Sequence, residues 1–565
     1  MKFEPIALKE GSEVEIAFEG EPVKARHGES VASALASAGH MVLRATPKGT
    51  ERGVFCGMGV CRDCLVDIDG QRNVRACMTK VKPGMEIARA GRAGKPSTTD
   101  PNPPHVTIDS VKTETPDVLV IGAGPAGLAA ALAARRAGAH VVLADERAIP
   151  GGQYFKQPSA GQTIDAQQEE GRRLVEDVRH AGVDIWPETL VWGAFEPLVF
   201  AVNRGGGTLV VQPRAAVYAG GAFERPWPVP GWTLPGVMTT GAAQTMWRTD
   251  RRLAGKRVLI AGNGPLNLQV AAELARGGAE LVGVVESAAA PRSPPQAARL
   301  AINAPRLALQ GLRYLVDCRT MGVPVIYRSQ LARIAHVEGE LEATIAGAGA
   351  RTVRCDTVCL GYGFLPSSDL PRSLGARCDR DPATGMALLR RDAEGATTVD
   401  GLFAVGDCTG LGGARVALAD GALAGAAAAR HAGFDLGRSA ALSRQLRRAG
   451  RDTVRHRRFQ AALWTIFKPT VDEVTPTPET VMCRCEEVTY GEVEAALAEG
   501  IGGAGAVKRR TRVGMGHCQG RYCGALLAAI LERNGHRSDE YSGFAPRLPV
   551  KPIAIGSLAR DPSAK

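Results

Sequence analysis

The stretch Asp117–Gln153, DVLVIGAGPAGLAAALAARRAGAHVVLADERAIPGGQ, decides the fold at the centre of this chain. An apolar run predicts a buried strand, and the chain then turns on Gly122, Gly124 and Gly127 into an alanine-rich helix. These glycines permit a tight turn, the approach of a pyrophosphate to the backbone and close packing of the helix on the strand. A second apolar run leads to Asp145, where a carboxylate can hold a ribose hydroxyl. The stretch therefore predicts a dinucleotide site, and a purely structural glycine turn is the alternative.

Length and composition predict an ordinary soluble protein of several domains. With 565 residues the chain is long enough for about three to five domains. Its 45% hydrophobic and 22% charged residues are typical of a soluble protein. The first residues carry no basic segment followed by an apolar one, and the charge-free run Val118–Ala134 is too short to span a membrane. We therefore expect a cytoplasmic location, where the thirteen cysteines stay reduced.

The net charge of +11 is partly concentrated in one segment, Arg438–Arg458. The spacing of Leu442 and Leu446 there predicts a helix. A solvated or partner-facing helix is favoured, and binding of nucleic acid or lipid is the alternative.

A cysteine quartet lies near the N-terminus. Alternating apolar residues predict two short strands within 14–25, and a helix is predicted from Ser30 to Ala38. The following C-x4-C-x2-C loop with one later cysteine is the plant-type [2Fe–2S] ligand pattern. Zinc is less favoured because structural zinc prefers two closely spaced cysteine pairs, and unliganded core thiols are the third possibility. The predicted ligands are Cys56, Cys61, Cys64 and Cys77.

A second quartet lies near the C-terminus, in a C-x-C and a C-x4-C pair. This spacing resembles the bacterioferritin-associated-ferredoxin type of [2Fe–2S] domain, with zinc as the alternative. A basic run just before the second pair is predicted either to offset the cluster's charge or to be merely solvated; it contains Lys508, Arg509, Arg510 and Arg512. The predicted ligands are Cys483, Cys485, Cys518 and Cys523.

A second strand, glycine turn, helix and strand begin at Lys256. Gly262 and Gly264 open the helix, Asn267 replaces the third glycine, and Glu286 ends the second strand. The pattern predicts a second nucleotide site, and an acid without a following arginine favours NAD over NADP. A structural unit that binds nothing is the alternative.

After this insertion the chain is predicted to return to the first unit. Val358–Gly363 is expected to be its return strand, and Thr397–Gly410 supplies a strand that ends in Gly406 and Asp407 before a helix near Gly413. Asp407 can accept hydrogen bonds from a flavin's ribityl chain. The split pattern resembles the two-dinucleotide fold of the pyridine nucleotide–disulfide reductase class. The resemblance implies NAD on Gly262, Gly264 and Glu286, and FAD on Gly122, Gly124, Pro125, Ala126, Gly127, Asp145, Glu146, Gly152, Gln153, Gly406 and Asp407.

The chain departs from that class because it has no redox-active cysteine pair. Five cysteines outside the two quartets are expected to be buried structural thiols: Cys318, Cys355, Cys359, Cys378 and Cys408. Electrons leaving the flavin must therefore go elsewhere, and the two cysteine quartets are the natural acceptors.

The order of these domains, with the phrases RPWPVPGWTLPGVMTTGAAQ and TRVGMGHCQGRYC, resembles the α-type flavoprotein subunits of amino- and imino-acid dehydrogenase complexes. That family includes opine oxidases, hydroxyproline and proline dehydrogenases, hydrogen cyanide synthase and heterotetrameric sarcosine oxidase. The resemblance implies that a partner of the D-amino-acid-oxidase type oxidises the substrate's C–N bond while this subunit relays electrons, with an FMN between the subunits in several relatives. No residue is assigned as a substrate base.

Two other functions stay open at this point. One is a self-sufficient NAD(P)H-dependent reductase, and the other is a non-catalytic scaffold whose second nucleotide unit binds a molecule such as ATP for structure. The predicted fold is α/β, a two-dinucleotide-binding flavoprotein fold preceded by an α+β (β-grasp ferredoxin-like) domain and followed by a small helical [2Fe–2S] domain. The predicted boundaries are 1–90 for the ferredoxin-like domain, 91–115 for a linker, 116–244 and 351–432 for the FAD domain, 245–350 for the inserted unit, 433–478 for a basic connector, 479–545 for the second [2Fe–2S] domain and 546–565 for a tail.

Overall fold

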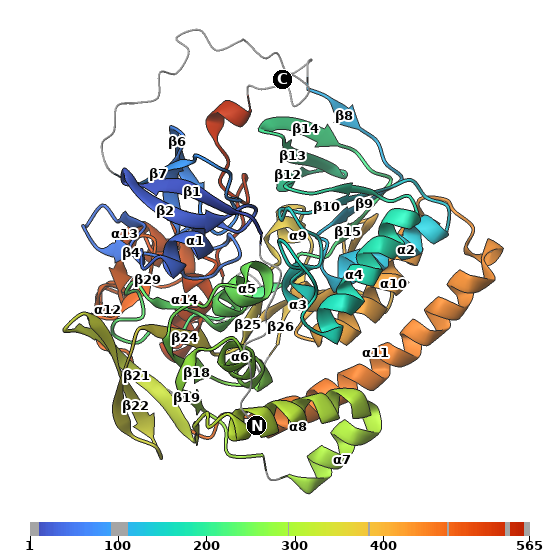
Figure 1. The fold of residues 1–565 in the computed structure, drawn as a ribbon. Coiled ribbons are helices and arrows are strands. Elements are labelled where there is room, and N and C mark those ends of the chain that lie inside the picture. The colour runs from blue at the N-terminus through green and yellow to red at the C-terminus, as the bar shows by residue number, and fades with distance from the viewer. Residues whose placement is uncertain are drawn as a thin grey trace.

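The computed structural model describes residues 11–91, 111–291, 293–381, 385–471, 474–536 and 543–558. Most of the predicted linker at 91–115, and the end of the predicted tail, lie outside these ranges. Figure 1 shows two central units, with the N-terminal domain and the C-terminal helices beside them. None of the helices in the described part is long and apolar enough to cross a membrane.

The N-terminal domain is a mixed sheet packed on one short helix. Its elements are β1 (Glu13–Phe18), β2 (Glu21–Arg26), α1 (Val31–Ser37), β3 (Arg44–Ala45), β4 (Glu51–Arg52), β5 (Leu65–Ile68), β6 (Gln71–Arg75) and β7 (Glu86–Arg89). The strand order is β2-β1-β7-β5-β6. The Ser30 side chain caps α1 by accepting a hydrogen bond from the amide of Ser33. The two strands and the helix predicted from the sequence are confirmed.

The first nucleotide unit is built on a five-stranded parallel sheet of order β11-β10-β9-β15-β28. Gly421 and Gly425 let its helices α2 and α10 touch, because an added Cβ would lie 2.2 Å from the carbonyl oxygen of Ala126 and 2.0 Å from that of Ala130. The elements are β8 (Thr113–Glu114), β9 (Val118–Ile121), α2 (Pro125–Arg136), β10 (Val141–Ala144), α3 (Gly152–Phe155), α4 (Ala166–His180), β11 (Asp184–Trp186), β12 (Leu190–Phe195), β13 (Val199–Arg204), β14 (Gly207–Val211), β15 (Ala215–Tyr218), β16 (Ala222–Glu224), β25 (Phe364–Pro366), α9 (Asp369–Ser373), β26 (Cys378–Arg380), β27 (Ala387–Leu389), β28 (Leu402–Ala404) and α10 (Gly413–His431).

The second nucleotide unit has its own parallel sheet, of order β17-β24-β18-β19-β20. A separate antiparallel sheet, β21-β22-β23, adjoins it. The elements are β17 (Val237–Thr239), α5 (Thr240–Asp250), β18 (Arg257–Gly262), α6 (Pro265–Arg276), β19 (Glu280–Glu286), α7 (Pro294–Asn303), α8 (Pro305–Thr320), β20 (Val325–Tyr327), β21 (Ser329–Val337), β22 (Glu340–Gly347), β23 (Arg351–Cys355) and β24 (Thr357–Gly361).

The prediction of a return strand at Val358–Gly363 is wrong. The strand at this place, β24, pairs in parallel with β17 and β18 and so belongs to the second unit. Its apolar run suits the centre of either parallel sheet, so the sequence pattern alone cannot select its neighbours. The sheet of the second unit therefore extends beyond the predicted 245–350 at both ends.

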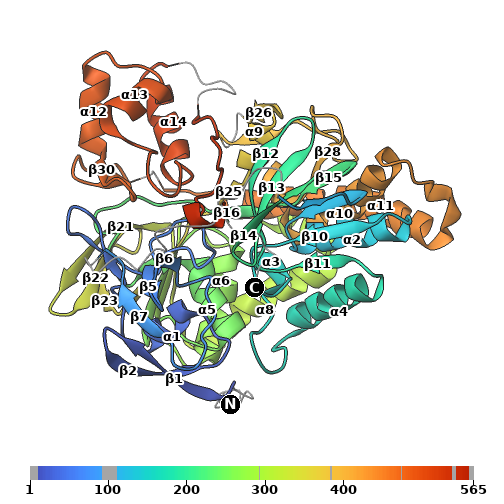
Figure 2. The same ribbon diagram turned by 90° about the horizontal axis from the view of Figure 1, so that it is seen from above.

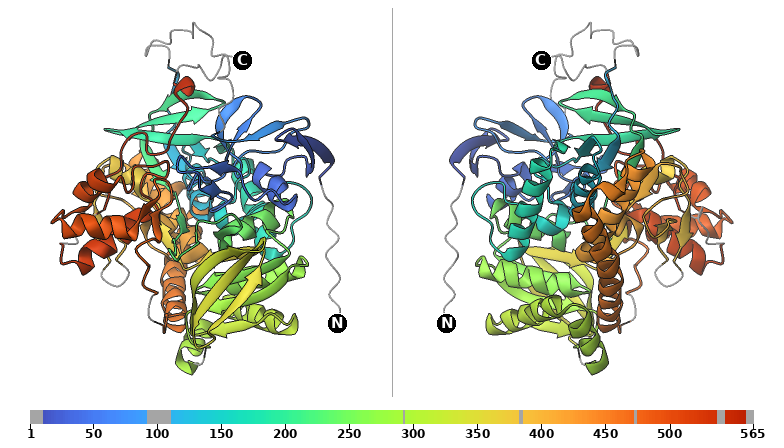
Figure 3. Two further views of the ribbon diagram at one scale, coloured as in Figure 1. Left: turned by 90° about the vertical axis from the view of Figure 1, so that its left-hand side faces the viewer. Right: turned by 90° about the vertical axis from the view of Figure 1, so that its right-hand side faces the viewer.

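The C-terminal part begins with a long helix and ends in a small helical domain. Its elements are α11 (Ala440–Ile466), β29 (Val481–Cys483), β30 (Val488–Thr489), α12 (Tyr490–Ala498), α13 (Ala504–Thr511) and α14 (Cys523–Arg533). The helix predicted within Arg438–Arg458 is part of α11, which buries Leu442 and runs from α10 towards α7 and α8 (Figure 3). Figures 1 and 2 both place α12–α14 on the same side of the central units as the N-terminal domain.

Candidate functional site

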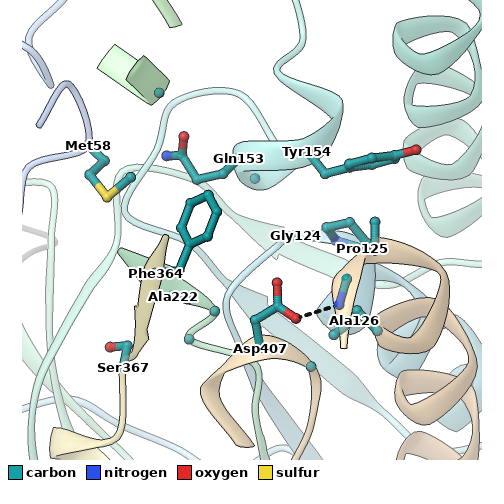
Figure 4. A pocket seen from close by; sticks show the side chains of 18 of the residues that line it. Met58, Gly124, Pro125, Ala126, Gln153, Tyr154, Ala222, Phe364, Ser367 and Asp407 are labelled. Atoms are coloured by element: carbon teal, nitrogen blue, oxygen red, sulfur yellow. Dashed lines mark hydrogen bonds between the residues drawn. The ribbon is translucent and has the colours of Figure 1, made fainter. Parts of the chain in front are cut away.

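A cavity of about 560 Å³ lies where the first unit faces the second. Figure 4 shows residues of the first unit and Met58 of the N-terminal domain around it, and Gly264 and Gln269 of the second unit also line it. Gly127, Gly262 and Glu286 are predicted contacts that do not line it. All of the other predicted nucleotide-binding residues do: Gly122, Gly124, Pro125, Ala126, Asp145, Glu146, Gly152, Gln153, Gly264, Gly406 and Asp407.

The glycine turn of the first unit forms a backbone cradle at the start of α2. Gly124 caps α2 without a side chain, so the first amides of the helix face the cavity. Gly127 serves packing, since an added Cβ would lie 1.7 Å from the carbonyl oxygen of Gly122. An added Cβ at Gly152 would lie 2.6 Å from the Cα of Gly124, so the second glycine pair must also stay small. This donor-rich cradle without side chains fits a pyrophosphate.

Two partly buried carboxylates flank this cradle. Asp145 accepts hydrogen bonds from the amides of Ala123 (2.5 Å) and Arg147 (2.7 Å), which tie the end of β10 to the glycine turn. Asp407 Oδ1 accepts hydrogen bonds from the amides of Gly412 (3.1 Å) and Gly413 (3.0 Å) at the start of α10. Burial raises the pKa of both carboxyl groups. Asp407 reaches into the cavity opposite Gln153, as the ribityl interpretation requires (Figure 4).

A lysine and a glutamate that the sequence analysis missed also line the cavity. Lys156, at the end of α3, donates to the carbonyl oxygen of Gly241 at 2.9 Å, and the Gly241 amide donates to Glu224 Oε1 at 2.8 Å. Burial lowers the pKa of Lys156 to about 7 and raises the pKa of Glu224 to about 7. The second carboxylate oxygen of Glu224 is buried without a hydrogen-bond partner among the described residues. The cavity therefore holds two ionisable side chains whose pKa values lie near neutral pH.

In the second nucleotide unit, the glycine turn and the acid at the end of the second strand form hydrogen bonds with other residues of the chain. Glu286 is buried, and its carboxylate accepts hydrogen bonds from the Asn263 side chain (3.0 Å) and the Gly264 amide (2.9 Å). Asn267, at the place of the third glycine, donates to the carbonyl oxygen of Gly361 at 3.0 Å and so joins α6 to β24. The side-chain amide thus provides the close helix-to-strand packing that a glycine provides in the first unit.

Residues that follow α11 cross the same edge of the second sheet. The carbonyl oxygen of Phe467 accepts a hydrogen bond from Asn263 Nδ2 at 2.7 Å, and Thr470 donates its amide to Ser287 at 3.1 Å. Pro469 forms an antiparallel bridge with Ala288, directly after β19. This is where an acid at the end of the second strand would meet a ribose. The chain's own backbone is therefore bonded to this edge, beside Glu286.

The N-terminal cysteine quartet borders the cavity. Met58, between two of its cysteines, and Met78, directly after the fourth, line the cavity wall. Arg147 of the first unit donates to the carbonyl oxygen of Gly57 in the cysteine loop at 3.1 Å, and Arg75 pairs with Glu146 at 3.1 Å. Glu146 also pairs with Lys551. These contacts hold the cysteine loop against the predicted flavin site.

The thiols of each quartet fall into two interacting pairs. In the N-terminal quartet the pairs are Cys56 with Cys61 and Cys64 with Cys77. Amides of the loop point at the sulfurs, since Met58 and Cys61 donate to Cys56 Sγ at 3.5 and 3.4 Å. Thiols in two pairs with amide donors suit a two-iron cluster.

The C-terminal quartet has the same arrangement. Cys483 and Cys523 are paired with their sulfurs 3.8 Å apart, and Cys485 is paired with Cys518. Within the described ranges no group of three or more Cys, His, Asp or Glu side chains is arranged to hold a metal ion. Interactions also cross between the pairs, since Cys77 is affected by Cys56 and Cys523 by both Cys485 and Cys518, so each quartet gathers its thiols as the ligands of one cluster must be gathered.

The five remaining cysteines lie apart from these quartets. All are buried, as expected from the sequence, and burial raises the pKa of Cys318 to about 11 and of Cys408 to about 12. Such thiols stay protonated and are poor nucleophiles. The proposed acceptors of electrons from the flavin are therefore the two quartets.

Comparison with known protein families assigns the same three parts. Residues 11–92 match the 2Fe-2S iron-sulfur cluster binding domain, residues 116–433 the pyridine nucleotide-disulphide oxidoreductase family and residues 481–533 the BFD-like [2Fe-2S] binding domain. The A subunit of opine oxidase from Rhizobium meliloti is 33% identical over 461 residues, which cover 78% of this chain and 98% of the relative. The chain belongs to the same family as this opine oxidase subunit.

Other members of this family are also named as subunits of enzymes. Hydrogen cyanide synthase subunit HcnB of Pseudomonas aeruginosa is 31% identical over 460 residues, which cover 78% of this chain and 97% of the relative. The crystal structure of L-proline dehydrogenase from P. horikoshii shares the fold, with a TM-score of 0.71, 20% identity and coverage of 99% of this chain and 100% of that one. The chain is thus a flavin and iron–sulfur oxidoreductase of the opine oxidase family, and the predicted fold class is confirmed.

Proposed function

We propose that the chain is the electron-transfer subunit of a multi-subunit dehydrogenase or oxidase that acts on the C–N bond of an amino or imino acid. Its partner is a flavoprotein of the D-amino-acid-oxidase type, which binds the substrate. FAD occupies the cavity of the first unit, and each quartet holds one [2Fe–2S] cluster. The bound cofactors supply one- and two-electron redox chemistry, while the protein holds them in place and sets their surroundings. The substrate is of the hydroxyproline, proline, opine, sarcosine or glycine class.

The contact between the cavity and the N-terminal quartet carries this proposal. Met58 and Met78 belong at once to the cavity wall and to the surroundings of the quartet, so no other domain separates the two sites. The C-terminal quartet adjoins both, since Cys518 packs in the same apolar cluster as Cys56 and Cys61, and Arg521, between two of its ligands, also lines the cavity. A cavity in contact with two adjoining quartets suits the relay of electrons better than the binding of a second organic substrate.

Two observations bear on the alternative of an NAD(P)H-dependent reductase. The cavity does hold Lys156 and Glu224, an acid and a base that the sequence analysis did not find. The second nucleotide unit argues against NAD(P)H as a hydride donor, because the backbone at 467–470 crosses the edge on which the ribose of NAD would rest. We therefore favour a second unit without NAD, and an FMN at the interface with the partner and a cytoplasmic location stay predictions.

Co-expression with a flavoprotein of the D-amino-acid-oxidase type from the same genome tests the proposal. The pair should copurify and reduce an artificial dye with one of the proposed amino or imino acids, whereas the isolated chain should not. A Cys61→Ser variant of the complex is the control, since it should keep binding the partner and lose dye reduction. Substrate-dependent reduction of the flavin in the isolated chain, under anaerobic conditions, would contradict the proposal and move the catalytic site to this chain.

A further inference from the structure

Three charged side chains are buried together where the N-terminal domain meets the C-terminal domain. Asp63, beside Cys64, accepts hydrogen bonds from Arg484 Nε at 2.7 Å and from Arg44 Nη2 at 3.2 Å. The side chains of Asp63 and Arg484 are 1% and 3% exposed, and that of Arg44 is 11% exposed. Arg484 lies between Cys483 and Cys485, so this contact joins the two cysteine loops directly.

Aromatic rings surround the same contact. The Arg484 guanidinium carbon lies 3.8 Å from the centre of the Phe55 ring and 4.7 Å from that of Trp232. The Phe55 ring lies 5.6 Å from the Tyr522 ring, edge to face. Phe55 precedes Cys56 and Tyr522 precedes Cys523, so both rings, like Asp63 and Arg484, are chain neighbours of predicted cluster ligands. This one group of side chains therefore connects the two quartets.

The charges in this group do not balance. Arg44, Asp63 and Arg484 sum to one positive charge, held where the dielectric constant is low and salt screens little. A buried ion pair contributes little to stability compared with apolar packing, but it disfavours every arrangement in which one partner loses the other. Arg484 is held on a second side as well, because its Nη1 also donates to the carbonyl oxygen of Trp232 at 2.7 Å. The group thus fixes the position of the two domains relative to each other and adds positive charge between them.

We propose that Arg484, held by Asp63, is a positioning residue that locks the two cysteine quartets against one another and raises the reduction potentials of both clusters. Each one-electron reduction adds a negative charge to a cluster, and a fixed guanidinium nearby favours that state. The inference rests on the proposed function only in that both quartets hold clusters. It assigns to Arg484 a role that neither its neighbours in sequence nor the family comparison provides.

The experiment compares three variants of the purified holoprotein: Arg484→Met, Arg484→Lys and Arg510→Met. Arg510 is the matched control, because it lies in the same domain but is 54% exposed and paired with Glu499. Iron and acid-labile sulfide analysis first establishes that both clusters are present. A redox titration, monitored by circular dichroism in the visible range, then gives the reduction potentials of the clusters. Electron paramagnetic resonance of the dithionite-reduced protein reports the magnetic coupling between the clusters.

Arg484→Met should shift both potentials to more negative values and weaken the magnetic coupling. Arg484→Lys should keep most of the potential, because the charge remains, and Arg510→Met should leave both readouts unchanged. Potentials and coupling in Arg484→Met that match those of Arg510→Met would overturn the inference. If Arg484→Met fails to retain its clusters, Arg484→Lys decides, since potentials far below those of the parent would show that the charge is not what matters. Absence of iron from the parent protein would instead refute the proposed function.

Discussion

Replacing Arg52 by methionine should loosen the C-terminal domain from the N-terminal one. The Arg52 side chain is 0% exposed, that of Glu487 is 7% exposed, and their charged atoms lie 3.1 Å apart. Glu487 accepts a second hydrogen bond from Thr46 Oγ1 at 2.8 Å, so it is held across the interface by two residues of one domain. Without the cation a buried carboxylate loses its countercharge, which costs about 3–5 kcal/mol. Local opening should then become roughly a hundred to several thousand times more frequent, since about 1.4 kcal/mol is a factor of ten.

Hydrogen–deuterium exchange measured by mass spectrometry gives this number directly, because amides of a docked segment exchange through local opening. The peptide to follow is 481–489, which contains β29 and β30. Arg510→Met is the control, since an exposed ion pair contributes about 0–1 kcal/mol. The double variant Arg52→Met with Glu487→Gln should recover much of the protection because it removes the stranded charge as well. An exchange rate that rises less than tenfold in Arg52→Met would refute the reasoning. So would a double variant in which this peptide exchanges as fast as in the single variant.

Three further predictions concern the cofactors. Gly124→Val should abolish FAD binding in a folded protein. A Cβ added at this position has only the Cα of Gly152 within 4 Å, at 3.8 Å, so the new side chain projects into the cavity. An unchanged flavin spectrum would show that this glycine is not part of the site. Cys61→Ser should remove the paramagnetic signal of one cluster and leave the other, with iron falling from about four to about two per chain. Lys156, with its pKa lowered to about 7 by burial, is uncharged above that pH in the oxidised protein, so flavin reduction there should draw an additional proton onto it. The plot of flavin midpoint potential against pH should steepen above about pH 7, and Lys156→Met should show no such break.

The parts of the site that the sequence predicted are those whose chemistry is local. A glycine turn works because of the backbone at Gly122 and Gly124, and cysteine ligands within one loop must have a restricted spacing. Both patterns can be found without knowing any distant contact. The structure brings Asp407 and Gln153 to the same cavity because two parallel strands of one sheet end at the same edge, a consequence of topology that the resemblance to a known fold implied.

The parts that the sequence did not predict depend on contacts between distant residues. The strand at Thr357–Gly361 has apolar neighbours in either sheet, and only the three-dimensional packing selects the second. The basic run that contains Arg510 and Arg512 is conspicuous in the sequence because its charges are contiguous. In the structure these two side chains are exposed and pair with Glu499 and Glu486. The buried arginine, Arg484, stands alone in the sequence, and its partner lies in another domain.

The position of these contacts explains what is gained by having both cysteine domains in one chain. The cysteine loop of the N-terminal domain is held on one side by the flavin-binding unit, through Arg147 and Glu146. On the other side it is held by the C-terminal domain, through Arg484 and Glu487. In the proposed relay, an electron that leaves the cavity would thus pass between directly contacting domains, with no dependence on the encounter of separate proteins. Because these contacts include buried charges, substitutions far from the cavity are expected to change the potentials and the docking of the proposed clusters without altering the flavin site.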